Sequence, residues 1–212
     1  GSVAKMHPDT GAITVINSEF KIPAAANLDG KGNLWVVDTQ TGELSRVALA
    51  NGRKTVVKTL SPSLDNLAIS PEGTIYLSNM ADNAVLSFDP ASGELRTLTA
   101  GKLAVPAGLK IEGDTLWVAD IFAFREVDLK SGAVRDIHRM QASDLEYPFA
   151  VGINARQLLP SSWFTGSVQV LDRSSWKTAA MIHGLKAPMD AQFLADGSIA
   201  IAEIATGSIS IA

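Results

Sequence analysis

The sequence predicts an all-β fold, namely a β-propeller built from four-stranded antiparallel blades. Three observations lead to this prediction. A repeat recurs five times, each copy holds short apolar stretches separated by glycine turns, and no stretch shows a 3.6-residue apolar period of helical length. Units of four short strands that recur every roughly 40–50 residues are typical of propeller blades.

The most regular part of the repeat is a five-residue segment that is mostly apolar and usually ends in a polar residue. Its copies begin at Leu34, Ile75, Leu116, Leu158 and Ile199, which lie 41, 41, 42 and 41 positions apart. An aromatic residue follows the first position in three copies, as Trp35, Tyr76 and Trp117. Packing between blades requires large apolar side chains at such a position. We therefore expect these three rings to be buried.

A second apolar stretch precedes each of these segments and opens on a proline in four of the five copies. The opening residues are Pro23, Leu64, Pro106, Pro148 and Pro188. A proline at the first position of a strand removes no ladder hydrogen bond. Glycine turns such as residues 29–33 join the two stretches, and turns such as residues 89–93 join a third stretch to a fourth. Each repeat is therefore predicted to hold four strands, which we call a to d.

The number of blades follows less directly from the strand count. Strands a, b and d each occur five times, but strand c occurs six times, because residues 3–6 and 209–212 both match residues 85–88. We favour a six-bladed geometry with incomplete terminal blades and keep a five-bladed ring as the alternative. Open blade edges recruit partner strands, so a dimer through these edges is expected.

The domain organisation is predicted as a single β-propeller domain over residues 1–212. The blade segments are expected at residues 3–17, 23–60, 64–99, 106–140, 148–183 and 188–212. Residues 1 and 2, Gly-Ser, are interpreted as the remnant of a cleaved tag.

Composition excludes several classes of function. The net charge is −4 and no basic cluster occurs, which argues against nucleic-acid binding. No apolar run reaches the roughly 18–20 residues that span a bilayer. The chain has no cysteine, so disulfides, zinc–thiolate sites and cysteine nucleophiles are excluded. A periplasmic or secreted location is favoured, although the absence of cysteine does not fix the compartment.

The recurring elements are Pro-x-x-Leu/Val, Asp-Gly-x-Leu-Trp-Val-x-Asp and Asp-Pro-x-Ser/Thr-Gly, seen for example at residues 34–38, 116–120 and 89–93. They resemble elements of the SMP-30/gluconolactonase family and of the related NHL-repeat and streptogramin-lyase propellers. The resemblance covers essentially the whole chain and concerns the residues that build a blade. It implies a divalent cation, such as calcium or zinc, held at the starts of a strands in an enzyme that opens sugar lactones. The corresponding positions carry Asp65 and, one residue further on, Asn66 and Asp190.

The antiparallel order of a blade places the start of strand a and the end of strand b at the same edge. This edge collects Asp65, Asn66 and Asp190 from the a strands. The b strands end there in Asp38, Asn79, Asp120, Ser162 and Glu203. Ligands commonly bind to propellers where loops of several blades converge. An Asp or Asn at a strand end also fits a structural role, since it accepts hydrogen bonds from the following turn, whereas Glu203 suits such a cap less well.

Three further side chains, of His183, Trp163 and Phe164, are candidates for the same edge. His183 lies between strand d of one repeat and strand a of the next, while His7 and His138 occupy turn and outer-strand positions. Trp163 and Phe164 belong to the most irregular b–c passage and are expected either to pack between blades or to form apolar walls of a site.

Two functions remain open at this point. The first is a non-catalytic propeller that binds a small molecule or a protein through Asp65, Asn66, Asp190, Glu203, Asp120, His183 and Trp163. We place it ahead because most of the family's ligand positions carry other residues here. The alternative is a metal-dependent lactone hydrolase in which Asp65, Asn66 and Asp190 hold the cation. No residue is assigned a catalytic role.

Overall fold

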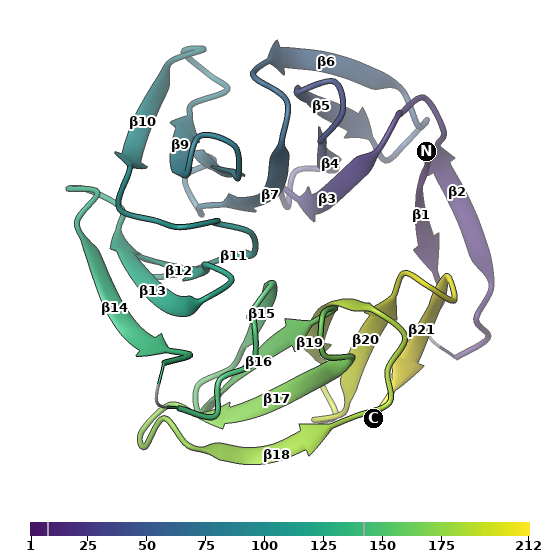
Figure 1. Ribbon diagram of the computed structural model, residues 1–212. Coiled ribbons are helices and arrows are strands. Elements are labelled where there is room, and N and C mark those ends of the chain that lie inside the picture. The colour runs from purple at the N-terminus through teal and green to yellow at the C-terminus, as the bar shows by residue number, and fades with distance from the viewer. Residues whose placement is uncertain (8, 142) are drawn as a thin grey trace. The chain divides into compact units, whose positions relative to one another are not determined.

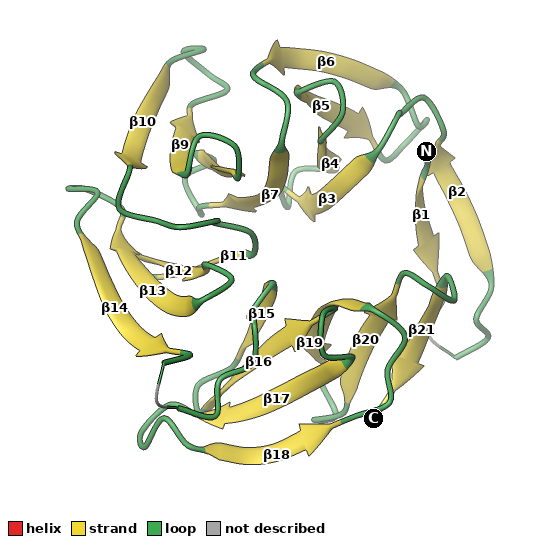
Figure 2. Cartoon of the chain, viewed as in Figure 1, coloured by secondary structure: helices red, strands yellow, loops and turns green. Residues whose placement is uncertain are grey.

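The fold is described from a computed structural model, which describes residues 1–7, 9–141 and 143–212. Every regular element in these ranges is a β-strand, as Figure 2 shows. The prediction of an all-β chain is therefore confirmed. Contacts along the chain group into two compact units, Gly1–Thr97 and Leu98–Ala212, and each unit is described by itself. The expectation of a single domain stays a prediction.

The first unit holds one two-stranded sheet and two blades, in which the strands lie side by side in chain order (Figure 1). The two-stranded sheet consists of β1 (Val3–Met6) and β2 (Ile13–Asn17). The next blade contains β3 (Pro23–Leu28), β4 (Asn33–Asp38), β5 (Glu43–Ala48) and β6 (Lys54–Thr59). The following blade contains β7 (Leu64–Ile69), β8 (Ile75–Asn79), β9 (Ala84–Phe88) and β10 (Leu95–Ala100), which crosses the unit boundary.

The second unit continues the same architecture with two four-stranded blades and one three-stranded blade. The first contains β11 (Leu109–Glu112), β12 (Thr115–Ala119), β13 (Ala123–Asp128) and β14 (Val134–Arg139). The second contains β15 (Ala150–Ile153), β16 (Gln157–Ser162), β17 (Ser167–Asp172) and β18 (Thr178–Ile182). The third contains β19 (Pro188–Phe193), β20 (Ile199–Glu203) and β21 (Ser208–Ile211).

The strand pattern is as expected, but the favoured blade number is wrong. The a–b hairpins build five blades, four of them with four strands and one with three. The first c strand, β1, and the d strand that follows it, β2, pair with each other in a sheet of two strands. A complete blade has strands a to d in one sheet, and the sheet of β1 and β2 contains no a or b strand. The structure therefore shows a propeller of five blades, not six.

Two of the predicted strand starts are also displaced. Pro23, Leu64 and Pro188 open β3, β7 and β19, but β11 begins after Pro106 and β15 after Pro148. Backbone bonds between neighbouring blades are found at both of these starts. The N–H of Gly108 donates to the carbonyl of Phe149 at 2.7 Å, and the carbonyl of Pro148 accepts from Ile121 at 3.1 Å. These bonds join adjacent blades just before the regular ladders of β11 and β15 begin.

Packing between blades accounts for the buried b strands. Consecutive side chains of a strand point to opposite faces, and both faces of β4 are covered. Leu34 and Val36 form a cluster with Val3 of β1, whereas Trp35 and Val37 belong to a cluster shared with β7 and β8. Trp35, Tyr76 and Trp117 are all buried, as the repeat predicts.

The second unit is packed in the same way and very closely. Leu158 of β16 lies in a cluster with Trp117, whereas the next residue, Leu159, lies in another with Ile201. A Cβ atom added to Gly152 of β15 would lie 2.2 Å from the carbonyl oxygen of Ala191 in β19. The two a strands therefore approach one another at a distance that only glycine allows.

Candidate functional site

Each blade has one edge where strand a begins and strand b ends, which we call the a/b edge. The register brings the two ends together, with Pro23 opposite Asp38, Leu64 opposite Asn79 and Pro188 opposite Glu203. The predicted candidates of each hairpin therefore share this edge within their own blade. The b–c turns and the loops that enter strand a lie at the same edge.

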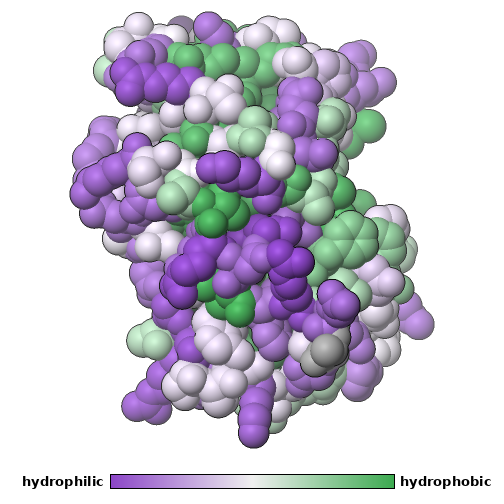
Figure 3. Space-filling model, turned by 60° about the vertical axis from the view of Figure 1, so that its left-hand side comes forward, coloured by the Kyte–Doolittle hydropathy of each residue, from purple (hydrophilic) through white to green (hydrophobic). Residues whose placement is uncertain are grey.

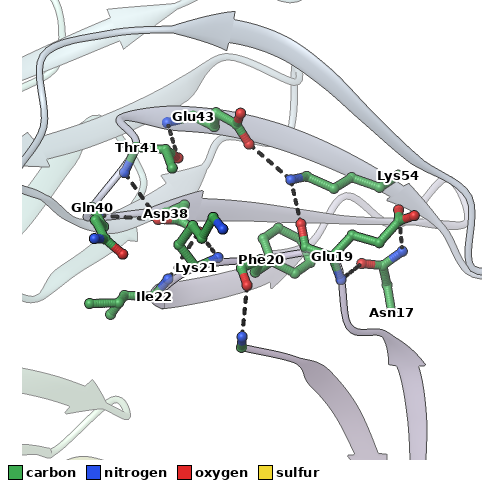
Figure 4. A network of polar contacts seen from close by, with 11 residues as sticks. Asn17, Glu19, Phe20, Lys21, Ile22, Asp38, Gln40, Thr41, Glu43 and Lys54 are labelled. Carbon is green, nitrogen blue, oxygen red and sulfur yellow. Dashed lines mark hydrogen bonds and ion pairs between the residues drawn. The ribbon is translucent and has the colours of Figure 1, made fainter.

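Asp38 shows what the polar residue at the end of a b strand does (Figure 4). Its carboxylate is fully buried and accepts hydrogen bonds from the backbone N–H groups of Lys21 at 2.7 Å and Ile22 at 3.1 Å. It also accepts from Gln40 and Thr41 in the following turn. Burial raises the pKa of Asp38, but these four donors offset it, so the pKa lies below its ordinary value.

Two more blades repeat this arrangement. Asp120 accepts from the backbone N–H groups of Ala104 and Val105, and Glu203 accepts from that of Lys186 at 2.6 Å. Each acid thereby anchors the loop that enters strand a of its own blade. Asp120 also forms an ion pair with Arg125, and Glu203 accepts from a serine hydroxyl in β21. The oxygens of both acids are engaged inside the protein.

The remaining b-strand ends are also buried. Asn79 Oδ1 accepts from the N–H of Asp82 in the following turn, and Ser162 is 1% exposed. The hydroxyl of Ser162 and the side-chain amide nitrogen of Asn79 have no hydrogen-bond partner among the described residues. For Glu203, hydrogen bonds from the hydroxyl of Ser210 and from the backbone N–H of Lys186 hold the pKa below its ordinary value.

Asp65 differs from all of these acids. It lies in the β-bulge between Leu64 and Leu67, the kind of irregularity that redirects a side chain. Its side chain is 9% exposed, and among the described residues its carboxylate has neither a hydrogen bond nor an ion pair. Burial raises its pKa to about 7. Asn66, next to it, uses Oδ1 to accept from the N–H of Leu67 at 2.9 Å.

Asp190 belongs to the second unit and is only half-buried. It accepts from the N–H of Ala191 at 2.9 Å and from the side-chain amide of Gln192 at 3.0 Å. Gln192 in turn accepts from Lys110 of β11 at 3.3 Å. Burial raises the pKa of Asp190, while Gln192, Ala191 and the charge of Lys110 act in the opposite direction.

The three predicted metal ligands are divided between the units, with Asp65 and Asn66 in the first and Asp190 in the second. Across residues 1–7, 9–141 and 143–212, no three His, Asp or Glu side chains are grouped as a metal site requires. Two of the three side chains also use oxygen atoms for bonds within their own strand. The assignment of a calcium or zinc ion to these residues stays a prediction.

The most conspicuous feature of the a/b edge is a row of five aromatic side chains in the second unit. We define the aromatic row as Phe149, Trp163, Phe164, Tyr147 and Phe122, in spatial order. Successive ring centroids lie 6.3, 4.3, 5.4 and 6.3 Å apart. Four of the rings are 38–52% exposed, and Phe149 is half-buried.

Three structural elements of two neighbouring blades supply this row. Phe122 lies in the turn between β12 and β13, Trp163 and Phe164 in the turn between β16 and β17, and Tyr147 and Phe149 in the loop that enters β15. Clustered exposed rings are uncommon on soluble proteins and mark binding surfaces. Trp163 was expected as a candidate and is part of the row, whereas Phe122, Tyr147 and Phe149 were not anticipated.

Two residues at the row have an unusual backbone conformation, Tyr147 itself and Ile121, which precedes Phe122. Ile121 has φ = 46° and Tyr147 has φ = 22°, both in the left-handed region that side chains with a Cβ atom rarely adopt. The hydrogen bond from Ile121 to Pro148 ties the two segments together. Such strain persists only where the surrounding structure imposes it and is concentrated at functional sites.

His183 is exposed in the loop between β18 and β19. The N–H of Leu185 in this loop donates to the carbonyl of Gly166 at 3.1 Å, so the loop lies beside the turn that carries Trp163. Of the predicted candidates in the second unit, the structure thus brings the segments of His183 and Trp163 together.

Hydrophilic and hydrophobic residues alternate over the face of the molecule drawn in Figure 3. Figure 3 shows one face of the molecule, on which hydrophilic residues surround small hydrophobic patches. Among the described residues, no helix has the length and apolar character needed to cross a membrane.

Comparison with solved structures identifies the fold as a β-propeller. No family model matches the sequence, and no curated protein matches it either. Among solved structures, a chain from a nidogen/laminin complex superposes with a TM-score of 0.76 at 19% identity, over 86% of this chain and 72% of that one. The virginiamycin B lyase of Staphylococcus aureus superposes with a TM-score of 0.69 at 15% identity, over 90% of this chain and 69% of the lyase. A streptogramin B lyase structure is similar to the same degree over 68% of its length. These similarities show the β-propeller fold, in line with the expected streptogramin-lyase-like architecture.

Proposed function

We propose that the protein is a binding propeller that holds a partner at the a/b edge of the blades β11–β14 and β15–β18. The aromatic row is the observation that carries this proposal. Aromatic side chains combine a large apolar area with few rotatable bonds and dominate the energetics of interfaces. The row lies where loops of two blades meet on a rigid scaffold, which is the usual location of a binding site in such folds.

The carboxylates of Asp120 and Glu203 are occupied by hydrogen bonds within the protein, which favours a binding role over acid–base chemistry for these two residues. Asp120 and Glu203 are buried and bound to backbone groups and to side chains of their own blades. Both acids anchor the loops that enter strand a of their own blades, which occupies their oxygens inside the protein. The similar chain in a nidogen/laminin complex is also part of an assembly of proteins, which agrees with a binding role.

Selection from a displayed random-peptide library tests this proposal. Peptides retained by the wild-type protein should bind the double variant Trp163→Ala, Phe164→Ala at least about tenfold more weakly, because central aromatic residues of an interface carry much of its binding energy. The matched control is Ile204→Ala, which removes another exposed apolar side chain from the turn between β20 and β21. Equal affinity of the wild-type protein and the double variant for every selected peptide would refute the proposed site.

A second candidate function is the metal-dependent lactone hydrolase, and one observation favours it. Asp65 is a buried carboxylate without a hydrogen-bond or ion-pair partner in the part of the chain that the structure describes, and groups of this kind are enriched at functional sites. The remaining donors fit a hard cation poorly, since about six oxygen ligands are needed and those of Asn66 and Asp190 are partly engaged. We therefore derive no reaction step through a metal ion.

Titration with calcium and with zinc by isothermal calorimetry separates this candidate from the first. A lactonase should bind one of these ions with a dissociation constant of about 1 mM or below, hydrolyse a simple sugar δ-lactone, and lose both properties in Asp65→Asn. If the wild-type protein shows no heat of binding and no hydrolysis at about 10 mM of either ion, the lactonase candidate is eliminated.

Dimer formation through open blade edges also stays a proposal. The observations that favour it are the exposed isoleucines Ile209 and Ile211 of β21 and the exposed Ile13 and Val15 of β2. Apolar side chains on a strand at the edge of a sheet promote pairing with another chain.

A further inference from the structure

We propose that the aromatic row, together with Glu146, binds an extended segment of a protein partner that carries an arginine next to prolines. This inference rests on the proposed binding function and names the chemistry of the partner. It follows from three observations: the tilt of the rings, an acid without a cationic partner beside them, and the rigid attachment of the loop that carries both.

The rings form a corrugated surface rather than a flat one. Trp163 is tilted by 34° to Phe164 and by 77° to Phe149, and Tyr147 is tilted by 45° to Phe164. Ridges between tilted rings suit a polyproline II helix, whose prolines protrude at each turn of about 9 Å. Trp163 and Tyr147, on either side of Phe164, lie within about one such turn. Proline-rich segments bind aromatic grooves with little loss of conformational entropy, because they are already extended.

Glu146 supplies a negative charge beside the row. It is half-buried, precedes Tyr147 and accepts a single side-chain hydrogen bond, from the hydroxyl of Ser167 at 2.6 Å. Within the described parts of the chain it forms no ion pair. A half-buried carboxylate that keeps acceptor capacity is stabilised by a cation from a partner.

The arginine of the strand that follows Phe122 is already paired within its own blade. Arg125 forms ion pairs with Asp120 and Asp136. Lys186 lies beside Glu203, whose pKa its charge helps to lower. Arg125 is thus not free to balance Glu146, and a positively charged partner complements this carboxylate. An arginine suits this place, because its guanidinium group can pair with a carboxylate and also stack on an aromatic ring.

The segment that carries Glu146 and Tyr147 is anchored before any partner arrives. The side-chain amide of the buried Gln169 donates to the carbonyl of Asp144 at 2.6 Å, and its oxygen accepts from the N–H of Glu146 at 2.8 Å. Leu145, between these two residues, is buried in the cluster around Trp117. Such preorganisation reduces the entropy lost on binding and favours a defined ligand geometry.

The test uses short synthetic polyproline peptides with arginine, glutamine or glutamate at the centre, and measures binding to the complete chain by calorimetry. The wild-type protein should prefer arginine to glutamine by about fivefold or more, and to glutamate by more than that. Glu146→Gln should remove most of the preference for arginine and leave binding of the glutamine peptide unchanged. The charge-matched control Glu94→Gln, on the first unit, should keep the full preference.

The outcomes separate this inference from the function on which it rests. The inference is overturned if the wild-type protein binds the three peptides equally, binds none of them, or if Glu146→Gln weakens the arginine and glutamine peptides alike. The binding function still stands in those cases if library peptides depend on Trp163 and Phe164. If library peptides bind without these two rings, both the function and the inference fail.

Discussion

Replacing Asp120 with alanine is expected to lower the free energy of unfolding by about 3–5 kcal/mol, as measured by urea denaturation. Asp120 is fully buried and accepts hydrogen bonds from the backbone N–H groups of Ala104 and Val105. It also pairs with Arg125, whose side chain is 13% exposed. Removing the acid takes this acceptor from two half-buried backbone donors and leaves a mostly buried cation with Asp136 alone.

The control for this prediction is Asp128→Ala. Asp128 is also an aspartate at the end of a strand and accepts hydrogen bonds in a turn, but it is exposed and anchors no distant loop. We expect its replacement to have a much smaller effect. Similar losses of stability in the two variants would show that turn capping, rather than anchoring of the entering loop, is the main role of Asp120.

The second large effect is expected for Asp65→Asn and has the opposite sign. Above about pH 7 this variant should be more stable than the wild-type protein, by up to about 4 kcal/mol. Burial raises the pKa of Asp65 from 3.8 to about 7, so the folded protein binds a proton that the unfolded chain has released. The free energy of unfolding of the wild-type protein should therefore fall as the pH rises from about 4 to about 7. The variant has no carboxyl group at this position, so this pH-dependent loss of stability should be absent from it.

Urea denaturation at a series of pH values, in the presence of a chelator, checks this prediction. The useful contrast is Asp29→Asn. Although burial raises the pKa of Asp29, hydrogen bonds from Asn33 and neighbouring groups bring it below its ordinary value, so its ionised form stabilises the fold. That variant should be less stable at neutral pH. If Asp65→Asn were also destabilising at about pH 8, a compensating partner of the Asp65 carboxylate would have to exist.

The strands and their packing could be predicted because each blade obeys local rules. The glycine turns and the alternating side chains depend on neighbouring residues, and the recurrence of Trp35, Tyr76 and Trp117 at one position of the repeat marks a ring that packs between blades. The structural role of the acids at the ends of the b strands was predicted only in part. Asp38 does cap its following turn, but it also binds Lys21 and Ile22, and a local turn pattern contains no information about that contact.

Features that depend on contacts between repeats were harder to predict. The blade number depends on how the surplus strands pair, and β1 and β2 pair with each other. The aromatic row is assembled from neighbouring blades, so its five members never appear together in the sequence. A signal nevertheless existed, because Phe122 and Phe164 each stand two residues after the polar end of a b strand, Asp120 and Ser162. Aligning the repeats at this position would have found them.

The anchoring acids have a consequence for how such a molecule can diversify. Each entering loop of these blades is fastened to its own blade, by Asp38, Asp120 or Glu203. The segments that enter these three hairpins, residues 18–22, 101–108 and 183–187, differ in length, yet the hairpins that follow them keep the same design. A loop can therefore be lengthened, shortened or replaced without disturbing the adjoining blade. The a/b edge is thus an exchangeable surface on a constant frame, suited to the grafting of new recognition loops.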